Sequence, residues 1–127
     1  MERAIEIFAA VQCLVIGLSH IIRARDWVDF FIWLRGKGHA GVFVNGFLSL
    51  GFGSIIVAFH NVWEGLATVL TVFGWAQVAK GLVSFVFPQV AMRSLARVSP
   101  DRAREFVAGG VPFLALSALF GYLAFTR

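Results

Sequence analysis

Four long apolar stretches limit what this chain can fold into. Residues 7–22, 40–59 and 106–126 contain no Asp, Glu, Lys or Arg, and residues 65–87 are interrupted only by Lys80. A helix of roughly 20 apolar residues crosses the ~30 Å hydrocarbon core of a bilayer, so each stretch is long enough, or nearly so, to be a span. Hydrophobic residues make up 59% of the chain and charged residues 14%, whereas soluble domains have about 45–50% and about 25%. The sequence therefore predicts an integral membrane protein.

The expected fold class is all-α: an integral membrane four-helix bundle with two short interfacial amphipathic helices. The strands of a membrane barrel alternate polar and apolar residues, and residues 47–52 do not sustain that alternation. Glu2 and Glu6 argue against a cleaved signal peptide, which begins with a positively charged region, so the first stretch is interpreted as a permanent span. One transmembrane domain is expected over residues 1–127, with spans at about 5–22, 40–59, 65–87 and 106–126 and interfacial helices at about 26–35 and 89–98.

Capping and turn residues predict where the connections lie. Asp26 is expected to cap the first interfacial helix, and Gly36 and Gly38 to end it. Ser99, which precedes a proline and an aspartate, predicts a new helix start that runs into the last span. Asn61 is the predicted turn residue between the second and third spans, which are close enough in sequence to form an antiparallel hairpin.

The two interfacial segments carry apolar residues suited to the headgroup boundary. In the second segment, Gln89 and Arg93 lie on the face opposite Ala91 and Leu95, which makes it amphipathic. The first segment is expected to place its aromatic and apolar residues at that boundary: Trp27, Val28, Phe30, Phe31, Trp33 and Leu34.

Lys and Arg are concentrated in two of the three connections. Positive residues favour the cytoplasmic side of a membrane, so residues 23–39 and 88–105 are expected to be cytoplasmic and both termini outside. The net charge of +4 favours anionic lipid headgroups at the cytoplasmic face as partners, and no nucleic acid is expected. The cytoplasmic set is Arg23, Arg25, Arg35, Lys37, Arg93, Arg97, Arg102 and Arg104, against Arg3 and Arg127 outside.

Lys80 is the residue of greatest functional interest, because a base inside a span is costly unless it snorkels, pairs or faces water. Side chains on a helix lean toward its N-terminus. Snorkelling of Lys80 to the cytoplasmic side works against that direction, so a partner or a bound anion is favoured. The residues expected to form a cytoplasm-facing polar cavity with it are Gln77, Asn45, His20, Ser19 and Ser84. A structural role, with Lys80 joining spans through hydrogen bonds, is the alternative.

A second polar group is predicted on the outer side, formed by His60, Asn61 and Glu64. Glu2 or Glu6 is able to approach His60 in a folded bundle, which allows a pH-sensitive or metal-touching cluster. The alternative is a His that simply interacts with the negative end of its own helix dipole.

The remaining motifs indicate packing more than chemistry. Small residues at spacings of three, four or seven let membrane helices approach closely; a pore lining is the alternative for them. Gly109, Gly110 and Pro112 predict that the last span is the one that bends. No metal-ligand spacing, carboxylate pair, nucleophile with a base or phosphate loop is found, so neither an enzyme nor a cofactor is expected. The small residues concerned are Gly46, Ser49, Gly53, Gly74, Gly81 and Ser84.

Several short motifs together resemble those of a group of small, uncharacterised four-span bacterial integral membrane proteins. They are Gly17-Leu18-Ser19-His20, Phe59-His60-Asn61-Val62-Trp63, Thr71-Val72-Phe73-Gly74-Trp75, Lys80-Gly81 and Phe87-Pro88. The resemblance implies a multi-pass protein of the bacterial inner membrane and no particular activity. In size the chain is also similar to small multidrug transporters and dual-topology fluoride channels, but it lacks their embedded glutamate and its charge bias opposes dual topology.

The function expected from the sequence is a non-enzymatic binding or transport module built around Lys80. The alternative is a structural or accessory subunit of a larger membrane complex. Four spans leave little room for a private pore, so transport would require a homo-oligomer.

Overall fold

The computed structural model describes residues 2–126. Four long helices, α1 (Glu2–Ile22), α3 (His39–Phe59), α4 (Ala67–Val86) and α6 (Ala103–Thr126), are each long and apolar enough to cross a membrane. Two shorter helices, α2 (Ala24–Gly36) and α5 (Pro88–Ala96), separate them, and a single 3-10 turn, η1 (Pro100–Arg102), precedes α6. The described chain contains no strand. The all-α fold with four candidate spans is thus confirmed.

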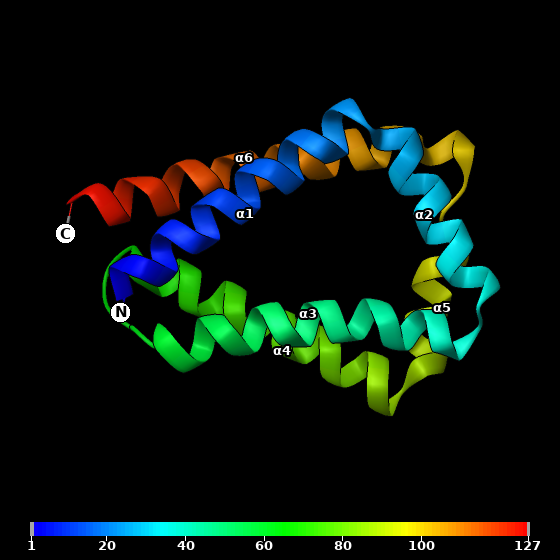
Figure 1. Cartoon of the computed structure of the whole chain (residues 1–127), viewed down its shortest axis with the longest axis horizontal. Coiled ribbons are helices and arrows are strands. Elements are labelled where there is room, and N and C mark those ends of the chain that lie inside the picture. The colour runs from blue at the N-terminus through cyan, green and yellow to red at the C-terminus, as the bar shows by residue number, and fades with distance from the viewer. Residues whose placement is uncertain (1, 127) are drawn as a thin grey trace.

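The four spans form two antiparallel pairs, α1 with α6 and α3 with α4 (Figure 1). Helix α2 runs across one end of the molecule and joins the pairs, and α5 lies at the same end. Both chain ends and the connection between α3 and α4 lie at the opposite end. The molecule therefore has an α2/α5 end and a termini end.

Small residues hold each pair together at short range. A Cβ added to Gly53 would lie 2.7 Å from the Gly74 carbonyl oxygen, and a Cβ added to Gly110 would lie 2.6 Å from the Gly17 carbonyl oxygen. Gly46 is packed against Ser84 in the same way. The prediction that these residues serve helix packing is confirmed, since their backbones occupy the space that a side chain would need.

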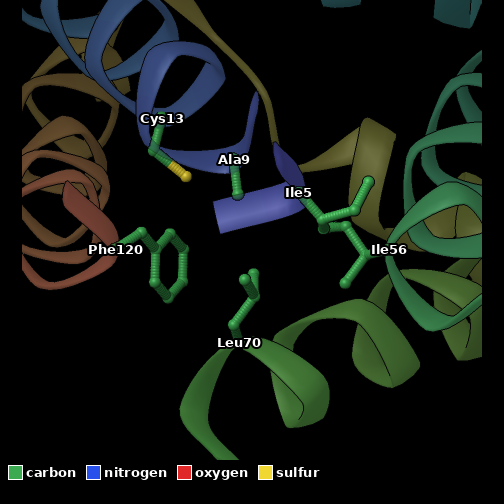
Figure 2. Packing of buried hydrophobic residues seen from close by; sticks show 6 residues of the cluster. All are labelled: Ile5, Ala9, Cys13, Ile56, Leu70 and Phe120. Atoms are coloured by element: carbon green, nitrogen blue, oxygen red, sulfur yellow. The ribbon is translucent and has the colours of Figure 1, made fainter. Parts of the chain in front are cut away.

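At the termini end a dry core joins the two pairs. Figure 2 shows Leu70 of α4 and Phe120 of α6 pointing toward Ala9 of α1, and Ile5 beside Ile56 of α3. These side chains are almost completely buried. All four spans therefore contribute to this core, which fixes the spacing of the pairs there.

At the α2/α5 end a second core forms from Leu34, Val42 and Leu95, which lie on α2, α3 and α5. Val28 is also buried. The expectation that Val28 and Leu34 settle among headgroups is therefore wrong, because both side chains pack inside the protein. Trp33, by contrast, is 57% exposed.

Several predicted helix ends differ from the structure. Asp26 does not cap α2, which begins at Ala24 without a side-chain cap, and lies instead in its first turn. Helix α2 does end at Gly36, and Gly38 takes the left-handed conformation (φ 65°) before α3. Ser99 is the N-cap residue of η1, as predicted, although its side chain makes no capping bond.

The connection between α3 and α4 turns at Gly65, whose φ is 61°, and not at Asn61. Glycine is favoured there because it has no Cβ to oppose a positive φ. Helix α6 continues through Pro112 from Ala103 to Thr126. Gly110 is buried against α1, so its small size serves packing.

Candidate ligand cavity

A cavity of about 470 Å³ lies at the α2/α5 end, between the two helix pairs. This volume is within the range of small-molecule sites, about 300–1,000 Å³. The lining comes from five helices and from the connection before η1. It includes Phe31 of α2, Asn45 of α3, Lys80 and Ser84 of α4, Ser94 of α5 and Phe106 of α6.

The helical period places the α4 side of this cavity. Lys80, Val83 and Ser84 lie three and four residues apart, so they share one face of α4. The Ser84 hydroxyl is buried and donates a hydrogen bond of 3.0 Å to the Lys80 carbonyl oxygen. Its proton is therefore already used within the helix. The Lys80 side chain extends from the same turn, at the open side of α4.

The Lys80 ammonium makes no hydrogen bond or ion pair with any of residues 2–126. The partners considered from the sequence, Asn45, Gln77, Ser84 and the surface acids, do not bond to it. No Asp or Glu lines the cavity. A positive charge within a span therefore faces a cavity without a protein counter-charge.

Asn45 and Ser94 complete the polar part of the lining. Neither side chain forms a hydrogen bond within the described chain. Together with Lys80 they supply N–H and O–H donors at the cavity, and an oxyanion accepts such donors.

The structure separates the other predicted cavity residues from Lys80. Gln77 packs toward Gly53 of α3 and does not line the cavity. Ser19 accepts a hydrogen bond of 2.8 Å from Trp27 Nε1. His20 donates from Nδ1 to the Ile16 carbonyl oxygen at 2.8 Å. Its ring stacks on the ring of Trp27, with centroids 4.3 Å apart.

The predicted outer group is likewise divided. His60 is fully buried, with Nε2 3.1 Å from Glu6 Oε2 and Nδ1 3.2 Å from Thr71 Oγ1. Asn61 is exposed, and its Oδ1 accepts hydrogen bonds from the indole N–H groups of Trp63 and Trp75 at 3.1 and 3.4 Å. Glu64 is exposed on the connection. Only His60 of the three is part of a buried polar cluster.

We call this buried set, Glu6, His60 and Thr71, the enclosed cluster. The Thr71 hydroxyl donates to the Val62 carbonyl oxygen at 2.7 Å and accepts from the Val62 N–H at 3.0 Å. With its proton used there, Thr71 Oγ1 accepts from His60 Nδ1. One further proton lies between His60 Nε2 and Glu6, so the pair carries no net charge. This proton assignment follows from the hydrogen-bond network.

Sequence reasoning placed Glu6 at the interface and did not single out Thr71. A signal was present for Glu6, because it adjoins the buried stripe of Ile5, Ala9 and Cys13 on α1. A carboxylate beside such a stripe requires a partner when it is buried. Within residues 2–126, no group of three or more His, Cys, Asp or Glu side chains is arranged to hold a metal ion.

No protein-family model, curated protein or solved structure matches this chain. The resemblance of the short motifs to small four-span bacterial proteins therefore identifies no family. The chain is described by its architecture, as a small protein with four candidate membrane-spanning helices.

Proposed function

We propose that this protein is a non-enzymatic membrane binding module, with or without transport, that takes up an anionic ligand in the cavity at Lys80. The observation that carries the proposal is the unpaired Lys80 ammonium at a cavity that contains no acid. Ionisable groups inside membrane spans are expensive and usually mark ligand or ion pathways. An anion would supply the missing counter-charge.

Binding without chemical change is the form that the lining favours. A Ser–Lys pair needs the serine proton directed at the amine. The Ser84 hydroxyl instead donates to a backbone carbonyl, and the lining contains no His, Cys or acid. These features support a ligand site rather than a catalytic one.

We further propose that the α2/α5 end faces the cytoplasm in a bacterial inner membrane. Support comes from the basic residues, eight of which lie in or beside α2 and α5 and in residues 97–104. In a background with Cys13→Ala, an impermeant thiol reagent applied from the periplasm should label Asn61→Cys and spare Asp101→Cys. Both positions are exposed, so the reverse labelling pattern would overturn this orientation.

The binding proposal is tested through amine reactivity, because Lys37 is the other lysine of the chain. Lys37 is exposed and lies over the Trp33 ring, outside the cavity. The protein in phosphatidylcholine nanodiscs is acylated with a water-soluble ester, and each lysine is quantified by mass spectrometry. Inorganic phosphate or dodecanoate should slow acylation of Lys80 and leave that of Lys37 unchanged. If neither probe alters the ratio, the proposal fails and an accessory role is favoured.

A further inference from the structure

We propose that the ligand is an amphiphile with one negative charge, whose oxyanion meets Lys80 and whose apolar chain lies along the cavity wall. This inference rests on the proposed function and names the ligand class for the same site.

The charge of the ligand follows from the charge of the lining. Lys80 is the one charged residue among the lining residues, and it has no partner within residues 2–126. A ligand with one negative charge therefore neutralises the site. A dianion would leave one charge unpaired in an apolar setting, which is costly.

The headgroup follows from the unused donors. Lys80, Asn45 and Ser94 line the cavity without side-chain partners of their own in the described chain. Ser84 has committed its proton to the Lys80 carbonyl oxygen. A carboxylate or phosphate group, which offers several acceptor lone pairs, satisfies such a set better than a neutral polar group.

The body of the ligand follows from the remaining walls. Apart from these polar groups the lining is hydrophobic and is shared by α2, α4, α5 and α6. Small inorganic ions would leave this surface without a partner, whereas an alkyl chain removes it from water. The apolar lining includes Phe31, Ala79, Val83, Val90, Leu95 and Phe106.

Fatty acids and anionic phospholipids share this chemistry, and the experiment distinguishes them. Acylation of Lys80 relative to Lys37 is measured in phosphatidylcholine nanodiscs with added dodecanoate, with phosphatidylglycerol built into the disc, or with inorganic phosphate. We expect protection by an amphiphile at concentrations where inorganic phosphate gives none. Protection by phosphatidylglycerol alone identifies a bilayer lipid, and protection by dodecanoate alone identifies a free amphiphile.

Cavity-filling variants test the position of the chain. Ala79→Phe fills the apolar wall from α4, and Val90→Phe fills it from α5; both positions are exposed, so the fold should tolerate them. Each should raise the half-protecting amphiphile concentration about tenfold or more, a factor of ten being 1.4 kcal/mol. Ala76→Phe, exposed on α4 outside the cavity, is the matched control and should behave as wild type.

The outcomes separate the two proposals. If inorganic phosphate protects Lys80 as well as the amphiphiles do, or if both filled variants keep full protection, the ligand class is wrong and the anion site stands. If no probe protects Lys80, the proposed function itself is wrong.

Discussion

At the termini end of the molecule, Glu6, His60 and Thr71 are fully enclosed and hydrogen-bonded to one another. At the α2/α5 end, Lys80 and Asn45 face a cavity and bond to no other described side chain. Both groups are carried by apolar helices, so the difference does not lie in their surroundings along the sequence. It lies in whether the polar atoms find partners within the protein.

This difference indicates different roles. A buried polar group costs free energy unless it is hydrogen-bonded, so a satisfied network holds its elements in one arrangement. The enclosed cluster joins α1, the end of α3 and α4 in this way. Unused donors at a cavity contribute nothing to the fold and remain available to a ligand. Stability should therefore depend on the enclosed cluster and binding on the Lys80 cavity.

The largest effect is expected from His60→Leu, which leaves the Glu6 carboxyl buried beside an apolar side chain. The free energy of unfolding in micelles should fall by about 3–5 kcal/mol, as when one member of a buried pair is removed. Adding Glu6→Leu should cost less than the sum of the single changes, because one interaction is shared. Exposed Glu64→Leu is the control. Strict additivity of the two changes would contradict the pairing.

Thr71→Val should have the next largest effect. Valine keeps the shape but leaves His60 Nδ1 and the Val62 N–H without their acceptor. Unfolding measurements should show a loss of about 1–3 kcal/mol, the cost of unsatisfied buried groups. Thr68→Val, one turn earlier on α4, serves as the control because Thr68 makes no side-chain hydrogen bond among residues 2–126. Equal losses for the two variants would assign Thr71 no special role.

Arg35→Met tests the frame of the cavity. Arg35 Nη1 donates to the carbonyl oxygens of Leu95, Ala96 and Val98 at 3.3, 3.3 and 2.8 Å, and so ties α2 to the end of α5. A loss of about 0.5–1.5 kcal/mol is expected, with faster amide exchange in α5. Arg25→Met, an exposed change on the same helix, should leave that exchange unchanged. Unaltered α5 exchange in Arg35→Met would show that apolar packing alone holds the helix.

Lys80→Met should have the smallest effect on stability, within about 0.5 kcal/mol, because no hydrogen bond or ion pair is lost. A loss of roughly 0.5–2 kcal/mol, the range for polar contacts between membrane helices, would show instead that Lys80 ties α3 to α4. In that case the double variant with Asn45→Leu would be non-additive. Thermal unfolding of the two single variants and the double variant decides between these roles.

The pairing of spans explains which cavity residues were predictable. Depth in the membrane follows from position along a helix, and it correctly placed Asn45 near Lys80. Depth also placed His20 and Ser19 in the cytoplasmic half, but it does not give the direction that a side chain faces. Because α1 pairs with α6, His20 stacks among Trp27, Phe106 and Phe113 and not beside Lys80.

The enclosed cluster was predictable only as a possibility for the same reason. Glu6 and His60 are 54 residues apart in sequence, and their contact requires the start of α1 to meet the end of α3. Hydropathy gives no information on that meeting. The sequence also led to Asn61 as the turn residue, but Gly65 takes the positive φ and Asn61 instead accepts from two indoles.

The sequence by itself determined the four spans, the two short helices between them and the presence of one base within a span. These are local properties, since the free energy of inserting a segment depends on its own length and composition. The tertiary structure decided that α1 pairs with α6, that Glu6 meets His60 and that Lys80 faces a cavity without a protein partner. Those features depend on which helix faces touch, and the faces are selected by close backbone packing at residues such as Gly17 and Gly110 and not by hydropathy.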